Sequence, residues 1–218
     1  MSFSPPPAQP LRIAGPAGEL EALREEPPEV AGAGIAVLCH PHPQHGGTMQ
    51  NKVVHTLARA CHELGMATLR FNYRGVGSSD GSYDGGRGET DDVRAVVARA
   101  RALWPERELT LAGFSFGAMV ALQAAPATHP ARMISVAPAV TRGEFGAIAR
   151  PAADWLVLMG DADEVVDPAA VRRWVAAFPD PPAFVNLPGA GHFFHGRLTE
   201  LKALVQDWLK RPGHLSQE

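Results

Sequence analysis

The sequence predicts an α/β fold with a mostly parallel central sheet and helices on both faces. Short apolar runs without polar alternation recur along the chain, which is typical of strands that are buried on both faces. Segments with apolar residues at helical spacing lie between these runs. Strands that alternate with helices in this way imply right-handed crossovers and parallel neighbours. No internal repeat, linker or second domain is visible in the 218 residues, so a single domain is expected.

Residues 1–29 are expected to form an N-terminal tail and an edge hairpin, and residues 30–218 the core of the domain. A Pro-rich start precedes weak alternation from Leu11 to Glu26 around Gly15 and Gly18. Alternation that is interrupted by turn residues is typical of a small hairpin at the edge of a sheet.

Six buried strands are predicted from the apolar runs. The runs are Ile35–Cys39, Ala67–Phe71, Leu109–Ala112, Met133–Ala137, Trp155–Met159 and Ala183–Leu187. In sheets of this kind the ligand site lies beyond the carboxyl ends of the strands. The residues that follow these runs are therefore the first candidates for chemistry.

Apolar residues three and four positions apart predict four helices. Their apolar positions begin at Val54, Val93, Val171 and Leu198. Asp167 before Pro168 is expected to open the third helix as its N-cap. Asp91 and Asp92 are expected in the first turn of the second helix, where acidic side chains complement the helix dipole.

The composition is that of an ordinary globular protein, with 45% hydrophobic and 20% charged residues. The formal net charge is −3 and both signs are interleaved, so no nucleic-acid or membrane partner is expected. No stretch approaches the roughly 18 apolar residues that span a bilayer, and the start of the chain lacks the pattern of a signal peptide. A cytoplasmic location is therefore expected. The two cysteines, Cys39 and Cys61, lie in apolar patterns and are expected to be buried packing residues rather than a disulfide.

A nucleophile is predicted at Ser115, in the pattern Gly113-Phe114-Ser115-Phe116-Gly117. The pattern follows a predicted strand and precedes the helix-like segment Ala118–Ala125, which is the context that a G-x-S-x-G turn requires. A serine on so tight a turn is strained, and only small residues fit two positions to either side of it. The turn would lift the hydroxyl out of the sheet at a helix N-terminus, where N–H groups favour developing negative charge.

A serine hydroxyl needs a base within hydrogen-bond reach, and histidine is the expected one. His192 lies in a glycine-rich loop after the last predicted strand, where folds of this order place the base. His195, in the same loop, is the alternative. His55 and His62 fall on a predicted helix and are expected to face solvent.

The imidazole in turn needs a carboxylate that holds its tautomer and stabilises its protonated form. The loop after the strand Trp155–Met159 offers Asp161, Asp163, Glu164 and Asp167. Asp167 is already explained as a helix N-cap. That leaves Asp161 and Asp163, and the physical chemistry of the residues alone does not separate them.

The order of Ser115, an aspartate and His192 on alternating strands and helices resembles the α/β-hydrolase superfamily. Further motifs resemble a group of small bacterial α/β-hydrolases, and the likeness covers nearly the whole chain after about residue 30. These motifs are Cys39–Pro43, Gly46–Met49, Asn51–Val54 and Arg70–Ser78. In the superfamily the acid commonly follows a Gly-x-x-Asp pattern, which here is Gly160–Asp163. The resemblance therefore implies Asp163 as the acid.

The resemblance also implies an oxyanion hole, and acyl transfer needs two donors there. One donor is expected from the backbone N–H of Phe116, the residue after the nucleophile. Many superfamily members take the other from a His-Gly-x sequence after an early strand, where this chain has His40-Pro41-His42. Proline has no N–H, so the N–H of His42 is the expected donor, with Gly46 or Gly47 as the alternative.

Two other patterns are given structural interpretations. The spacing of His40, His42 and His45 is compatible with metal ligands, but prolines interrupt the loop and no carboxylate or cysteine lies nearby in sequence. No metal site is expected. The glycines of Gly75–Gly77 match neither dinucleotide nor Walker spacing, and they are expected to form a tight turn.

The expected function is a serine hydrolase that cleaves carboxylic esters or related small-molecule acyl substrates through an acyl-enzyme, without a cofactor. Thioesterase, amidase or acyltransferase activity would use the same groups. A non-catalytic binding or scaffold protein with this fold is the alternative from another class. Only about fifteen residues, 140–154, stand where many lipases of the superfamily insert a helical cap. We therefore expect no cap domain and a preference for short acyl groups, and the sequence indicates no particular oligomeric state.

Overall fold

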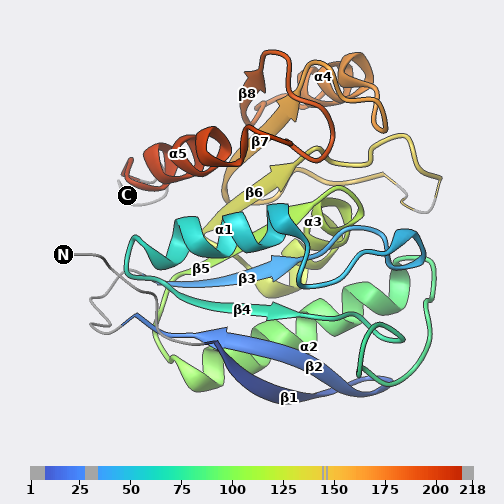
Figure 1. The fold of residues 1–218 in the computed structure, drawn as a ribbon, viewed down its shortest axis with the longest axis vertical. Helices are drawn as coiled ribbons and strands as arrows, with labels where there is room; N and C mark the ends of the chain where they lie inside the picture. The colour runs from blue at the N-terminus through green and yellow to red at the C-terminus, as the bar shows by residue number, and fades with distance from the viewer. Residues whose placement is uncertain (1–7, 28–33, 144, 146, 213–218) are drawn as a thin grey trace.

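The computed structural model describes residues 8–27, 34–143, 145 and 147–212. The chain forms one eight-stranded sheet in the order β1-β2-β4-β3-β5-β6-β7-β8, with helices on both faces (Figure 1). The strands are β1 (Gln9–Gly15), β2 (Gly18–Glu25), β3 (Ile35–Cys39), β4 (Ala67–Phe71), β5 (Leu109–Phe114), β6 (Arg132–Val136), β7 (Asp154–Gly160) and β8 (Ala183–Leu187). The helices are α1 (Lys52–His62), α2 (Arg87–Leu103), α3 (Phe116–Thr128), α4 (Pro168–Ala176) and α5 (Leu198–Leu209), with a 3₁₀ turn, η1, at Pro43–His45.

Parallel pairing dominates the sheet, as the sequence predicts. All neighbours from β4 through β3 and β5 to β8 are parallel. Within the described residues, antiparallel pairing is confined to β2, which pairs with β1 on one side and β4 on the other. β1 and β2 thus form a hairpin at one edge of the sheet. α1 and α5 pack together on one face, whereas α2 and α3 pack together on the other (Figure 1).

The central strands are buried along their whole length. Every residue of β3, β4 and β5 is buried, because helices cover both faces, and this explains their unbroken apolar runs. β3 lies between β4 and β5, so the order of the strands reverses at β3. Open α/β sheets bind ligands beyond the carboxyl ends of their strands at such a reversal. The residues that follow β3 and β5 occupy that position.

The second helix begins earlier than the sequence predicts. α2 starts two residues before Glu89, which is the acidic residue of its first turn, so the expectation that Asp91 and Asp92 lie in the first turn is wrong. The carboxylate of Glu89 accepts hydrogen bonds from the backbone N–H groups of Asp84 and Gly86, at 2.9 and 2.7 Å. These bonds satisfy N–H groups at the start of the helix and fix its first residue.

The burial of the cysteines agrees with the sequence, and that of one histidine does not. Cys39 and Cys61 are free thiols and both are buried, and His55 is exposed. The expectation that His62 faces solvent is wrong, because its side chain is buried at the last residue of α1. α5 packs along α1 and covers surface that the helical pattern of α1 alone would leave to solvent.

The connection between β6 and β7 contains no helix in the residues described, 137–143, 145 and 147–153. In this stretch the structure therefore shows no helical cap of the kind that many lipases insert. A separate finding concerns membranes: none of the helices in the described part of the chain is both long and apolar enough to cross one.

Candidate active site

Ser115 stands on a strained turn between β5 and α3. Its backbone has φ 56° and ψ −117°, a region that residues with a side chain rarely occupy. The turn is held by its backbone, because the N–H of Ser115 donates to the carbonyl of Val136 at 2.8 Å. The sequence predicted this turn from its five-residue pattern, and the geometry agrees.

The two glycines of the pattern are required by close backbone contacts. A Cβ on Gly113 would lie 2.3 Å from the carbonyl oxygen of Gly117. A Cβ on Gly117 would lie 2.4 Å from the carbonyl oxygens of both Cys39 and His40. No side chain fits at either position. The second contact also shows that the chain leaving β3 presses directly on the start of α3.

The nucleophile candidate lies at the positive end of a helix. Phe116 is the first residue of α3, and the N–H groups of a first helical turn have no partner within the helix. They and the helix dipole favour negative charge beside Ser115. The Ser115 side chain is largely covered, with 7% of the residue exposed, so these dipoles act in a site with little water.

Asp163 and His192 form a buried pair on the loops that follow β7 and β8. The Nδ1 atom of His192 lies 2.8 Å from Oδ2 of Asp163, and both side chains are almost fully buried. The other oxygen of Asp163 accepts the N–H groups of Val165 and Val166, each at 2.8 Å. An ionised carboxylate only accepts, so Nδ1 of His192 carries the hydrogen and Nε2 of the neutral ring is the basic nitrogen.

The structure separates the two aspartates that the sequence left open. Asp161 does not reach His192, and its Oδ1 instead accepts the N–H of Gly189 at 2.5 Å. Glu164 accepts the backbone N–H of His192 at 3.2 Å. Both therefore hold the loop that carries His192, and of these three carboxylates Asp163 is the one hydrogen-bonded to the imidazole. His195, the alternative base, is exposed and stacks on Phe193.

Packing places His192 next to the nucleophile turn. Its ring centroid lies 4.8 Å from that of Phe114, the residue before Ser115. No hydrogen bond joins Ser115 to His192 among the residues that the structure describes. Contacts between catalytic groups are often long without substrate and shorten in the reacting complex.

The loop after β3 brings His42 to the other side of the Ser115 turn. The His42 ring lies 4.8 Å from the ring of Phe116. The N–H groups of Gly46 and Gly47, the alternative donors to an oxyanion, are already used, because they donate to the carbonyls of Pro43 and His42 at 3.2 and 3.0 Å. The geometry therefore argues against both glycines as donors to an oxyanion.

The ring nitrogens of His40 and His42 are engaged by protein groups, and the ring of the exposed His45 lies 4.6 Å from that of His42. The ring nitrogens of His40 contact the carbonyl of Pro41 and the N–H of Tyr73. The His42 ring accepts the N–H of Gln44 through Nδ1 and contacts the Tyr83 hydroxyl through Nε2 at 3.1 Å. Within the described residues, no group of three or more His, Cys, Asp and Glu side chains is suited to hold a metal ion.

The contact of His42 with Tyr83 was not anticipated from the sequence. Tyr83 lies on the long connection from β4 to α2, and its ring also packs 6.0 Å from Phe116. No local sequence pattern identifies Tyr83, because the residues around a tyrosine in a glycine-rich connection do not indicate which distant loop it contacts. The structure thus adds an aromatic side chain above the candidate oxyanion hole.

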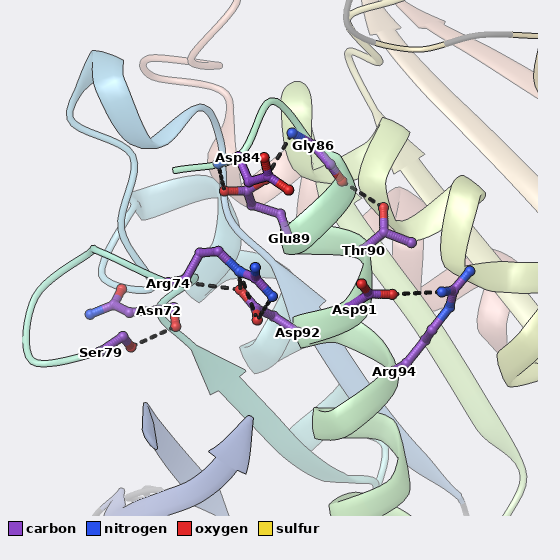
Figure 2. Close-up of polar contacts among 10 residues, drawn as sticks. All are labelled: Asn72, Arg74, Ser79, Asp84, Gly86, Glu89, Thr90, Asp91, Asp92 and Arg94. Carbon is purple, nitrogen blue, oxygen red and sulfur yellow. Dashed lines mark hydrogen bonds and ion pairs between the residues drawn. The ribbon is translucent and has the colours of Figure 1, made fainter. Parts of the chain in front are cut away.

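A buried ion pair anchors this connection to α2, as Figure 2 shows. The guanidinium of Arg74 donates to both oxygens of Asp92 at 2.7–3.1 Å, and the Arg74 backbone N–H donates to Asp92 at 3.0 Å. Asp92 is fully buried. Its hydrogen bonds raise the pKa of Arg74 above its ordinary value. Nearby, the Ser79 hydroxyl donates to the carbonyl of Asn72 at 2.8 Å, which stabilises the turn predicted around Gly75–Gly77.

Comparison with known proteins bears on this arrangement. The family model described as serine aminopeptidase, S33, matches residues 33–155, more than half of the chain. The chain belongs to this family of α/β-hydrolases. The match spans the strands β3 to β6, the Ser115 turn and the loop that carries His42.

Solved structures place the chain among α/β-hydrolases over almost its full length. A Xanthomonas campestris protein described as an α/β serine hydrolase without lid is 44% identical, with 97% of this chain and 100% of that one covered and a TM-score of 0.88. A serine hydrolase homologue from Coxiella burnetii is 45% identical, with 92% and 97% covered and a TM-score of 0.88. An uncharacterized protein of Rickettsia prowazekii is 31% identical over 205 residues, which are 89% of this chain and 86% of that protein.

Proposed function

We propose that this α/β-hydrolase cleaves small carboxylic esters or related acyl substrates with Ser115 as nucleophile, His192 as base and Asp163 as the acid that orients it. The observation that carries the proposal is the buried 2.8 Å contact between His192 and Asp163, on loops that meet beside a strained serine at a helix N-terminus. This combination is the constellation of groups that activates a serine hydroxyl.

The proposed acyl transfer depends on Nε2 of His192, which is the basic nitrogen of the ring. Because Nδ1 of His192 is held by Asp163, Nε2 takes the proton of the Ser115 hydroxyl as the oxygen attacks the acyl carbon. The N–H groups of Phe116 and His42 would stabilise the oxyanion. When the tetrahedral species collapses, the bond to the leaving group breaks and His192 gives that group its proton. Water then attacks the acyl-enzyme by the same route and releases the acid and free Ser115.

A non-catalytic protein with this fold is the alternative from another class. Backbone strain at Ser115 and a buried carboxylate paired with a histidine both cost folding free energy. A protein that only binds a ligand does not need these two costly features at one place. We therefore favour catalysis, and an acyltransferase or thioesterase with the same triad is distinguished from an esterase by its substrates.

A fluorophosphonate probe tests the nucleophile directly. We expect covalent labelling of the folded protein at Ser115, and no labelling of Ser115→Ala. The matched control is Ser78→Ala, which removes an exposed hydroxyl and should label like the wild type. Kinetic assays should use p-nitrophenyl acetate and an amino-acid p-nitroanilide, because the matched family is described as serine aminopeptidases. Hydrolysis of the anilide alone would move the substrate class to amides, and a wild-type protein that neither labels nor hydrolyses either substrate would contradict the proposal.

A further inference from the structure

His40 is a buried side chain for which the triad has no use. It follows β3 directly and is completely buried. Its Nε2 lies 3.1 Å from the backbone nitrogen of Tyr73, and its Nδ1 lies 2.6 Å from the carbonyl oxygen of Pro41. The N–H of Tyr73 can only donate, so Nε2 accepts. Nδ1 must then carry the hydrogen of the neutral ring and donate to Pro41.

The carbonyl that His40 holds belongs to the peptide that carries the candidate oxyanion donor. The oxygen of Pro41 and the N–H of His42 are parts of one planar peptide unit, which is trans because the described residues contain no cis peptide bond. In a trans unit the C=O and the N–H point in opposite directions. A hydrogen bond that fixes where the Pro41 oxygen points therefore also fixes where the His42 N–H points.

This peptide is enclosed on its other sides as well. A Cβ on Gly47 would lie 2.0 Å from the oxygen of Pro41, so the backbone of Gly47 closes directly over it. The carbonyl of His42 accepts the N–H groups of His45 and Gly47 at 3.1 and 3.0 Å. The carbonyl of His40 lies against Gly117 at the start of α3. The His42 peptide is thus held at both ends, next to the helix that supplies the Phe116 N–H.

The His40 ring keeps one hydrogen-bond donor and one acceptor over the pH range in which the protein would work. Burial lowers the pKa of His40 to about 3, and the hydrogen bond to Pro41 opposes this only in part. The ring is therefore neutral, with one nitrogen to accept and one to donate. A protonated ring would have two donors and would lose its bond with the N–H of Tyr73.

We propose that His40 is a positioning residue that locks the Pro41–His42 peptide in the orientation in which the His42 N–H serves the oxyanion hole. The inference rests on the proposed function, because it assigns a role in that same site. It goes further by naming a residue that contacts no reacting atom and acts through the carbonyl of Pro41. It also gives His40 a purpose that neither a metal site nor simple packing supplies.

Two amide substitutions separate the donor of His40 from its acceptor. In His40→Asn the side-chain nitrogen can occupy the place of Nδ1 and still donate to Pro41, whereas the bond with Tyr73 is lost. In His40→Gln the longer side chain can bring an oxygen to the place of Nε2 and still accept from Tyr73, whereas the bond with Pro41 is lost. Each variant loses one hydrogen bond, so a purely structural role predicts similar losses of stability and activity in both.

The readouts are kcat and KM for p-nitrophenyl acetate, the rate of fluorophosphonate labelling and the Tm. Loss of one oxyanion donor lowers kcat by about 10²–10³-fold. We expect kcat and the labelling rate of His40→Gln to fall by about 10²-fold with little change in KM, and those of His40→Asn to stay within about 10-fold of the wild type. Equal loss in the two variants, or losses that follow Tm, would overturn the proposal. A wild type that does not label would remove the proposed function, and the role of His40 with it.

The wild-type protein gives a second test that needs no variant to fold. The ¹⁵N spectrum of the His40 ring should show hydrogen on Nδ1 and none on Nε2 from about pH 5 to 8. The backbone N–H resonance of His42 should move strongly downfield when Ser115 is phosphonylated, whereas those of Gly46 and Gly47 should move little. A hydrogen on Nε2, or a His42 resonance that does not respond in a labelled protein, would show that His40 does not orient an oxyanion donor.

Discussion

At the scale of single residues, the site depends on which hydrogen-bond partners a few polar atoms have. Asp163 uses one oxygen for two backbone N–H groups and the other for His192. Asp161, two positions earlier, faces the other way and holds the N–H of Gly189. The sequence could not separate these aspartates from physical chemistry, because both lie in one loop and the path of that loop decides which one reaches the histidine. Only the resemblance to a family pattern pointed to Asp163.

The first prediction contrasts these two aspartates. In Asp163→Asn the amide oxygen still accepts from the N–H groups of Val165 and Val166, so the NH₂ group is turned toward His192. A donor there favours the tautomer with hydrogen on Nε2, which cannot take the proton of Ser115. We expect kcat to fall by about 10⁴-fold, as is typical when a triad histidine is held in the wrong tautomer.

Asp161→Asn is the matched control for this experiment. Its amide oxygen can still accept the N–H of Gly189, so kcat should stay within a few-fold of the wild type. Steady-state kinetics of both variants on p-nitrophenyl acetate make the comparison, with circular dichroism to confirm that each is folded. If Asp161→Asn were the damaging change, the assignment of the acid would be wrong.

At the scale of elements, an ion pair and hydrogen bonds join the start of α2 to the connection from β4. Asp92 and Arg74 form the buried ion pair of Figure 2, and Glu89 ties the residues just before the helix to its first turn. The connection between these anchors carries Tyr83 to His42. The helix period of the sequence predicted that α2 exists, whereas its first turn depends on Glu89 meeting backbone groups that precede it. That contact is invisible to a pattern of apolar residues.

The second prediction uses the neighbouring aspartates of α2, both drawn in Figure 2. Asp92→Asn removes the charge that compensates a largely buried guanidinium, and breaking a buried pair in this way typically costs about 3–5 kcal/mol of unfolding free energy. Asp91→Asn removes one member of an exposed pair with Arg94, and such pairs contribute about 0–1 kcal/mol. Urea unfolding measures both. Equal effects of the two changes would show that the Arg74–Asp92 pair does not stabilise the fold.

At the scale of the whole molecule, chain order and strand period predicted most of the architecture. The six apolar runs all became parallel neighbours in one sheet, and the residues proposed for catalysis all follow the carboxyl ends of β3, β5, β7 and β8. The sequence was less informative where two distant segments meet. His62 is buried at the end of α1, and α1 packs against α5, a helix more than one hundred residues later in the chain. The partner of Tyr83 depends likewise on how two loops are brought together above the sheet.

The last prediction concerns the shape of the substrate. The described residues between β6 and β7 form no helix, so they build no helical cap, although the Phe145 ring of this stretch packs 5.3 Å from that of Phe116. The large hydrophobic side chains that are exposed in the described part of the chain are Val165 and Phe193, which neighbour Asp163 and His192 in sequence. Two such side chains can cover a short acyl or leaving group, but they cannot enclose a long chain.

Each methylene that stays in water forgoes about 0.8 kcal/mol of binding, so lengthening the acyl group beyond what these side chains cover should add little transition-state stabilisation. We expect kcat/KM for p-nitrophenyl esters to be highest for acyl groups of about two to six carbons and to show no jump above the solubility limit. The series from acetate to palmitate measures this, with Ser115→Ala as the blank for spontaneous hydrolysis. A steady rise toward palmitate would contradict this prediction, because it would require a long apolar pocket beside Ser115.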